Sequence, residues 1–213
     1  MQLEKIYTRI DHTVLKQTTT WDAIQTLCDE AIRNGAASVC IPPCYVEKAK
    51  QYTKDAMQIC TVIGFPNGYQ TTMVKLVETK EAIAYGADEI DMVINLCDVK
   101  NGEWDKVRHE IKALKHACGN RVLKVIIETC YLTEEEKVQL CHIVTDAGAD
   151  YIKTSTGFGS AGATVEDVAL FRRECGAEVK IKAAGGIRTV ETAEQMIAAG
   201  ADRLGSSALL GGK

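Results

Sequence analysis

Short apolar runs recur along the chain, and most of them follow a glycine. Gly-Ala pairs begin at Gly35, Gly86, Gly148, Gly176 and Gly200, and a related Gly-Asn pair begins at Gly119. Each pair follows an amphipathic stretch and precedes a short apolar run, and β-branched residues are prominent in most of these runs. Glycine just past a helix end favours the left-handed cap conformation. Short apolar runs of this kind are typical of buried parallel strands. The pattern therefore predicts a repeated helix–turn–strand unit.

The repeated unit predicts eight strands that alternate with seven helices. The strands are expected at 6–12, 37–41, 57–64, 88–95, 121–128, 151–155, 178–183 and 202–206. The helices are expected at 21–34, 45–54, 72–85, 103–118, 133–147, 164–175 and 190–199. Thr133 with Glu136, and Thr164 with Asp167, fit helix-start capping patterns. Strict alternation predicts parallel strands with right-handed crossovers, and eight units favour closure into an α/β (β/α)8 TIM barrel.

A doubly wound open sheet is the alternative architecture. The absence of a Gly-x-Gly-x-x-Gly motif after the first strand weakens it. No linker, charge block or low-complexity tract divides the chain, so residues 1–213 are expected to form a single domain. A barrel of this class typically needs about 250 residues. Because the eighth strand is complete by Ser206, we expect the closing helix and tail to be short or missing, with at most a stub of seven residues.

Composition and charge narrow the classes of function. The chain is 46% hydrophobic and 25% charged, as in ordinary soluble globular proteins. A net charge of -4 argues against a general nucleic-acid binder. No apolar run approaches the roughly 20 residues that span a bilayer, and the first residues lack a secretory h-region. Nine scattered cysteines indicate free thiols in a reducing compartment. We therefore expect a cytoplasmic protein without nucleic-acid or membrane partners.

Charged residues fall on one face of several predicted strands. Alternate residues of a strand share a face, so the face away from the helices is predicted to carry Asp11, Glu89, Asp91, Lys124, Lys153, Lys180 and Lys182. A single lysine at a strand end is equally well explained as a solvated charge without a function. Several ionisable residues on the inner faces of central strands are harder to dismiss, because an unpaired buried charge is costly. Such clusters are where perturbed pKa values and chemistry are usually found.

Metal and hydrolase chemistry find little support. A metal centre needs a cluster of ligands, but His109, His116 and His142 fall within predicted helices, and no second cysteine pair accompanies Cys40 and Cys44. We expect no metal and no cofactor. No Gly-x-Ser-x-Gly elbow marks a serine hydrolase. A nucleophilic Cys40 with His12 as its base is formally possible, although a buried structural thiol is the favoured interpretation of Cys40.

The residues of this sequence fit lysine chemistry better than metal or hydrolase chemistry. A neutral lysine amine can form a Schiff base with a carbonyl substrate, whereas an ordinary lysine, with a pKa near 10.4, is charged at pH 7. A neighbouring cation and partial burial both disfavour the charged form. Lowering the pKa by about three units requires roughly 4 kcal/mol of bias from the surroundings. Lys153 and Lys182 are predicted on adjacent strands at similar depth, where one ammonium could depress the pKa of the other.

Three Gly- or Ser-rich segments follow the sixth, seventh and eighth predicted strands. They cover 154–157, 184–188 and 205–207. In barrels, the loops after strands seven and eight often hold a phosphate on backbone N–H groups, and glycines let the backbone approach the anion closely. A bare Gly-Gly also fits a tight turn. Two such loops beside two lysines favour a phosphate site.

These motifs resemble the deoxyribose-phosphate aldolase family over nearly the whole chain. The segments that carry the resemblance are Asp11-His12-Thr13, VIGFP at 62–66, GADEIDMVIN at 86–95, KVIIET at 124–129, GADYIKTSTG at 148–157 and KAAGGIR at 182–188. The resemblance implies a metal-independent class I aldolase of deoxyribonucleoside catabolism. Such an enzyme cleaves 2-deoxy-D-ribose 5-phosphate reversibly to glyceraldehyde 3-phosphate and acetaldehyde.

The resemblance also implies residue roles. Lys153 would form the Schiff base, Lys182 would lower the pKa of Lys153, and Asp91 would relay a proton through an ordered water. Gly157, Gly185, Gly186, Gly205 and Ser207 would contact the phosphate. The rest of the expected substrate-binding set is Asp11, Cys40, Lys124, Thr129, Thr156, Ile187 and Ser206. The expected ligand is a phosphosugar, and a homodimer is consistent with the family.

One feature departs from the family pattern. Relatives continue past the last strand with a helix and a tail that often ends in a tyrosine, which assists proton transfer at the enamine carbon. No tyrosine follows Ser206 in this sequence, so slower exchange of the acetaldehyde methyl protons is expected. The alternatives to this function are another lysine-dependent phosphosugar aldolase and a catalytically silent phosphosugar-binding barrel.

Overall fold

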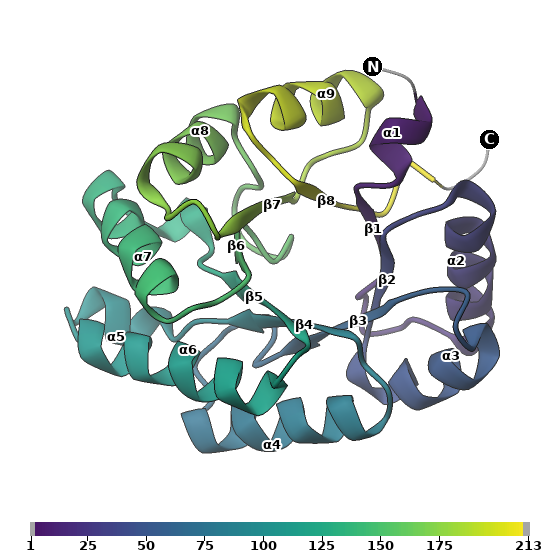
Figure 1. Cartoon of the computed structure of the whole chain (residues 1–213), viewed down its shortest axis with the longest axis horizontal. Helices are drawn as coiled ribbons and strands as arrows, with labels where there is room; N and C mark the ends of the chain where they lie inside the picture. Colours follow the sequence, from purple (N-terminus) through teal and green to yellow (C-terminus); the bar gives the residue numbers. More distant parts are fainter. Residues whose placement is uncertain (1–2, 211–213) are drawn as a thin grey trace.

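Eight parallel strands close into a barrel in chain order, with the helices arranged around the outside (Figure 1). The structure is a computed structural model that describes residues 3–210. The strands are β1 (Ile10–Thr13), β2 (Ser38–Ile41), β3 (Ile59–Ile63), β4 (Glu89–Val93), β5 (Val122–Ile126), β6 (Tyr151–Lys153), β7 (Lys180–Ala184) and β8 (Arg203–Ser206). β8 pairs with β1, with Asp11 opposite Gly205. The predicted TIM barrel is confirmed, and the open-sheet alternative is wrong.

The outer layer contains the seven predicted helices and two short ones. Their bounds are α1 (Leu3–Tyr7), α2 (Trp21–Asn34), α3 (Val46–Thr53), α4 (Thr72–Ala84), α5 (Leu96–Lys100), α6 (Trp104–Cys118), α7 (Glu134–Asp146), α8 (Val165–Glu174) and α9 (Val190–Ala199), with 3-10 turns η1 (Pro43–Tyr45) and η2 (Thr129–Tyr131). The Thr133–Glu136 capping box forms at the start of α7. The Thr164 hydroxyl accepts a hydrogen bond from the Asp167 amide. Both predicted helix starts are confirmed.

The first predicted strand is wrong at its beginning. Residues 3–7 form the short helix α1, whose Ile6 is fully buried, and β1 starts only at Ile10. α5 was also not predicted. It begins where the Asn95 side chain accepts a hydrogen bond from the Cys97 amide. Helices of five residues are too short to show a 3.6-residue period, so the hydrophobic pattern cannot reveal them.

Glycine caps set the junctions between most helices and strands. Gly35 ends α2 with φ 65°, and Gly200 ends α9 with φ 119°, the left-handed region that favours glycine. Gly176 is an exception, because α8 ends at Glu174 and the following Cys175 is already extended. Most outward strand residues, such as Val39, Ile90 and Ile152, are fully buried against the helices. The inward faces are thereby left to the polar residues.

The barrel closes without a helix immediately after β8. Within the described residues, 207–210 form bends rather than a helix, and the last three residues of the predicted stub lie outside the described range. Among residues 3–210, no helix is both long enough and apolar enough to cross a membrane.

Candidate active site

The inward strand faces bring three lysines onto one carboxylate. Asp91 lies on β4, and its Oδ2 is 2.7 Å from the Nζ of both Lys153 on β6 and Lys182 on β7. Its Oδ1 is 2.8 Å from Nζ of Lys124 on β5. Asp91, Lys124 and Lys182 are fully buried, and Lys153 is 3% exposed. Four of the predicted inward charges therefore meet in one cluster around Asp91, whereas Lys180 is exposed at the start of β7.

Strand register explains why the two candidate catalytic lysines meet. β6 and β7 pair in parallel with Lys153 directly opposite Lys182. The side-chain period of two then points both ammonium groups into the barrel at one depth. Both nitrogens reach the same carboxylate oxygen, so the adjacency predicted from the sequence is borne out in position.

A deeper layer of charges supports this cluster. Asp11 on β1 forms an ion pair with Lys182, and its Oδ1 is 2.5 Å from the Arg203 guanidinium. Glu89 lies 2.6 Å from Lys124 and 3.2 Å from Arg203. Buried charges of this kind persist only when each has a partner. Residues from six of the eight strands thus form one ion-pair network inside the barrel.

The network assigns protonation states to its central groups. Burial raises the pKa of the Asp91 carboxyl, but the ammonium groups of Lys124, Lys153 and Lys182 outweigh burial and hold it well below its usual range. Burial lowers the pKa of Lys182, but the Asp11 and Asp91 carboxylates outweigh this and raise it above its ordinary value. Asp91 is therefore an anion and Lys182 a lasting cation beside Lys153.

A cleft of about 380 Å³ opens above the ion-pair network. Lys153 reaches its floor, and the loops after β6, β7 and β8 form much of its wall. The predicted site residues that line it are Lys153, Thr156, Gly157, Gly185, Gly186, Ile187, Gly205, Ser206 and Ser207. The three Gly- or Ser-rich segments singled out from the sequence therefore converge on one cavity that contains a lysine.

The other predicted site residues lie outside the cleft wall. Asp11, Cys40, Asp91, Lys124 and Lys182 are fully buried in the barrel interior. Thr129 begins η2 after β5, and its buried hydroxyl has no hydrogen-bond partner within the described part of the chain. Direct contact of these six residues with a substrate stays a prediction. Of these six residues, Asp91 contacts Lys153 directly, and Lys182 shares the same Asp91 oxygen.

Two residues of the predicted phosphate loops have visible local roles. The Ser206 hydroxyl donates a hydrogen bond to the Ile187 carbonyl at 2.8 Å, which ties the end of β8 to the loop after β7. Gly185 has φ 85°, and a Cβ there would lie 2.9 Å from the Gly162 Cα. This loop therefore needs glycine at 185 for both its conformation and its packing.

Sequence reasoning missed several residues of the site. Lys16 and Arg188 line the cleft as exposed cations, and Arg203 and Cys60 belong to the buried network. Two of these residues could have been predicted from the sequence. Arg188 belongs to the Gly-Gly-Ile-Arg segment, and Arg203 lies two residues before Gly205 and so shares its strand face. Lys16 lies in a loop without periodicity, and nothing in the sequence marks it.

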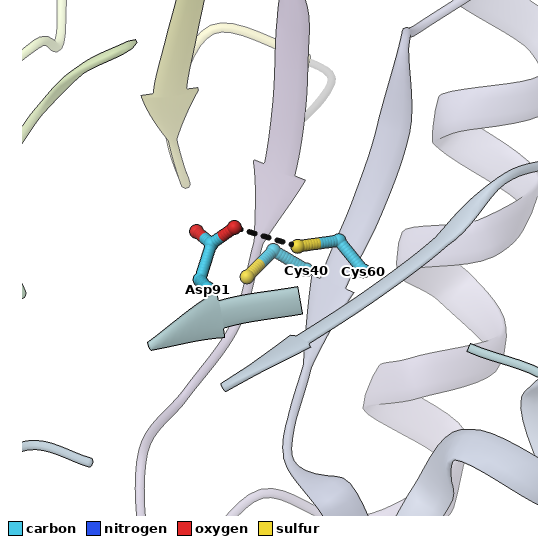
Figure 2. Close-up of side chains that lie close together, drawn as sticks. All are labelled: Cys40, Cys60 and Asp91. Carbon is cyan, nitrogen blue, oxygen red and sulfur yellow. Dashed lines mark hydrogen bonds between the residues drawn. The ribbon is translucent and has the colours of Figure 1, made fainter. Parts of the chain in front are cut away.

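The Cys40–His12 pair left open by the sequence does not form. His12 lies on the outer face of β1, and its Nε2 is 2.9 Å from Glu30 on α2. Cys40 instead points into the barrel beside Cys60 and Asp91 (Figure 2). The strand period places the two side chains on opposite faces, which excludes the pair as a nucleophile and its base.

Two overlapping groups of buried side chains have the composition of a metal site, and the second is Asp11, Cys60 and Glu89. Ligand atoms of Cys40, Cys60 and Asp91 lie within 4.8 Å of one another (Figure 2). Asp91, however, already accepts three ammonium groups. A divalent cation would have to displace them and would be repelled by the same lysines. The arrangement suits an anionic carboxylate among cations better than a metal centre.

Comparison with known proteins places this geometry in a family. Residues 5–211 match the DeoC/LacD family aldolases. The chain belongs to this family. It is 56% identical over 207 residues to the deoxyribose-phosphate aldolase of Clostridioides difficile (strain 630), covering 97% of this chain and 94% of the relative. It is 57% identical over 211 residues to that of Clostridium botulinum (strain Alaska E43 / Type E3), covering 99% and 96%.

A solved structure of the family has the same barrel. The tetrameric deoxyribose phosphate aldolase from Aeropyrum pernix superposes with a TM-score of 0.91 at 31% identity, covering 98% of this chain and 89% of that one. The resemblance read from the sequence motifs is therefore confirmed at the level of the family and the fold.

Proposed function

We propose that this DeoC/LacD family aldolase cleaves 2-deoxy-D-ribose 5-phosphate to glyceraldehyde 3-phosphate and acetaldehyde, reversibly, through a Schiff base on Lys153. One observation carries the proposal. Lys153 reaches the floor of a cleft while sharing a carboxylate oxygen of Asp91 with a second, permanently charged lysine. The two clostridial relatives are deoxyribose-phosphate aldolases, which agrees with this substrate.

The chemistry needs an electron sink next to the bond that breaks. The neutral Lys153 amine adds to the C1 aldehyde, and loss of water with uptake of one proton gives a protonated imine. A base takes the proton of the 3-hydroxyl, the C2–C3 bond breaks, and its electron pair moves into the imine to form an enamine. Glyceraldehyde 3-phosphate leaves. Protonation of the enamine carbon and hydrolysis of the resulting imine release acetaldehyde and restore Lys153.

The neighbouring charges supply the proton transfers. Asp91 is the nearest base to Lys153, with Oδ2 at 2.7 Å from Nζ, so it can accept the proton that the ammonium must lose. Lys182 contacts the same oxygen. Its ammonium therefore lies beside the Lys153 amine. Asp91 and Lys182 together can then move the proton of the 3-hydroxyl, through water where the distance requires it.

The cleft wall offers a place for the phosphate. The loop after β7 brings Gly185 and Gly186 to the cleft just before α9, and Ser207 follows β8 on the same wall. Lys16 and Arg188 add two positive charges, and neither side chain has an ion-pair partner within residues 3–210. Backbone N–H groups beside a helix start, with cations at the rim, suit a dianion.

Trapping with borohydride tests the proposal. Incubation with acetaldehyde and sodium borohydride should convert one imine to a stable ethylated lysine, and peptide mass mapping should place it on Lys153. The variant Lys153→Met should yield no adduct. The control variant Lys180→Met removes the lysine at the start of β7, next to β6, and should yield as much adduct as the wild type. Absence of an adduct on Lys153 in the wild type contradicts the proposed mechanism.

The same experiment separates the alternative functions. An adduct with another carbonyl donor but not with acetaldehyde favours a different phosphosugar aldolase. Binding of the phosphosugar without any adduct favours a silent barrel. The single-domain boundaries, the homodimer and the cytoplasmic location stay predictions.

A further inference from the structure

The two oxygens of Asp91 have separate sets of partners. Oδ2 faces Lys153 and Lys182, the two lysines of the proposed chemistry. Oδ1 faces away from them and contacts the Lys124 ammonium and the Cys60 thiol. One oxygen is therefore placed for proton transfer, and the other is held by residues from β5 and β3.

Cys60 is built into the barrel interior next to this carboxylate. Its side chain is fully buried, and its Sγ lies 3.1 Å from Asp91 Oδ1. Lys124 Nζ donates to the same sulfur at 3.3 Å. Cys40 sits directly opposite Cys60 in the register of β2 and β3. Figure 2 shows both sulfurs near Asp91, with the hydrogen bond drawn from Cys60.

The thiol of Cys60 is the donor in this hydrogen bond. Burial raises the pKa of Cys60 well above its ordinary value, and the Cys40 sulfur and the Asp91 charge add to this, so the thiol keeps its proton. Asp91 is ionised and can only accept. A thiol has one hydrogen, and a bond to a charged acceptor is the stronger choice.

Fixing Oδ1 also fixes Oδ2. The terminal torsion of an aspartate has a broad, two-fold preference, so the carboxylate has no sharp orientation of its own. Lys124 divides its three ammonium donors among Oδ1, Glu89 at 2.6 Å and the Cys60 sulfur. The Cys60 thiol supplies a second, independent donor from another strand.

We propose that Cys60 is a positioning residue for the reaction: its thiol holds Oδ1 of Asp91 so that Oδ2 stays on Lys153 and Lys182. This inference rests on the proposed aldolase function. Cys60 does not line the cleft, so its effect on Lys153 passes through its partners Asp91 and Lys124.

Three variants test the role of the donor. Cys60→Val fills the space without a donor and should lower kcat about tenfold, a loss equivalent to about 1.4 kcal/mol of transition-state stabilisation. KM for deoxyribose 5-phosphate should stay within about twofold, because the predicted phosphate loops are untouched. Cys60→Ser keeps a donor and should recover part of kcat. Cys118→Ala removes a buried thiol from α6, outside the barrel interior, and should match wild type.

The readout separates positioning from loss of structure. kcat is referred to the number of sites that borohydride and acetaldehyde trap on Lys153, so unfolded molecules do not count. The inference is overturned if Cys60→Val has the wild-type kcat per trapped site. It is also overturned if Cys60→Ser and Cys60→Val lose the same fraction of kcat. If the wild type itself gives no adduct on Lys153, the proposed function fails instead. The two failures are therefore distinguishable.

Discussion

Lys153 and Lys182 are the same residue type in nearly the same place, yet their surroundings differ. Lys182 is fully buried and pairs with two carboxylates, Asp11 and Asp91. Lys153 pairs with Asp91 alone and has access to the cleft. A nucleophile must shed its proton and meet the substrate, whereas a cation that biases its neighbour must do neither. The two environments therefore support the proposed division of roles, with Lys153 as the nucleophile and Lys182 as the fixed charge.

This division predicts the effect of Lys182→Met. Removing the charge should lower kcat about a hundredfold or more, within the range attributed to proton-transfer groups. Binding of deoxyribose 5-phosphate should change little, since Lys182 does not line the cleft. Steady-state kinetics and equilibrium binding measure the two effects. Lys180→Met serves as the control. A variant with near-wild-type turnover would show that Lys153 does not depend on the neighbouring ammonium.

The loop after β7 shows how an element prepares a binding site. β7 ends at Ala184, and α9 begins at Val190 after its Thr189 cap. Between them, Gly185 lies in the left-handed region and close against Gly162 in the loop after β6. At the wall of the cleft, Gly185 is thus required both by its backbone conformation and by the close packing of two loops. The geometry of this turn depends on a residue without a side chain.

Gly185→Ala should therefore damage binding at the phosphate end. The new Cβ meets backbone at 2.9 Å in a conformation that L residues rarely adopt. We expect KM for deoxyribose 5-phosphate to rise about tenfold or more, and the rate with unphosphorylated deoxyribose to change far less. Gly148→Ala is the matched control, because φ there is 71° and a Cβ would meet nothing within 4 Å. Equal effects on both substrates would argue against a phosphate site in this loop.

At the scale of the whole molecule, the ion-pair network joins strands that are far apart in the chain. Asp11 and Arg203 link β1 to β8, where the barrel closes. Asp91 links β4 to β5, β6 and β7. Breaking a buried pair leaves an uncompensated charge and costs about 3–5 kcal/mol. The charges that prepare the chemistry also make global stability sensitive to pH.

The pKa shifts give the direction of this pH dependence. Asp11 and Asp91 have a pKa below the ordinary 3.8, so the stability they add is present above that pH and is lost as the pH falls further. Lys182 has a pKa above 10.5, so its contribution is complete below that pH and is lost as the pH rises through the folded-state value. We expect urea midpoints that are nearly level between about pH 5 and 9 and lower on both sides. A midpoint that falls steadily from pH 5 to 9 would contradict this network.

Much of the fold followed from local pattern. α2 and α9 have the bounds that periodicity and the flanking glycines predicted, and the start of α7 follows from Thr133 and Glu136. The start of β1 failed, because α1 owes its place to the burial of Ile6 rather than to any repeating pattern. Short elements held by tertiary contacts leave no periodic signal.

The sequence by itself determined the barrel, the family and the position of Lys153 next to Lys182 on the neighbouring strand. Helix and strand periods and short motifs are local properties, so they can be recognised without the tertiary structure. Only the tertiary structure decided that Asp91 gathers three lysines, that Cys60 holds its second oxygen and that Asp11 and Arg203 support the cluster from below. Those contacts join residues up to 192 positions apart. Their distances depend on how eight strands close, and the energy of a buried charge depends on every neighbour at once.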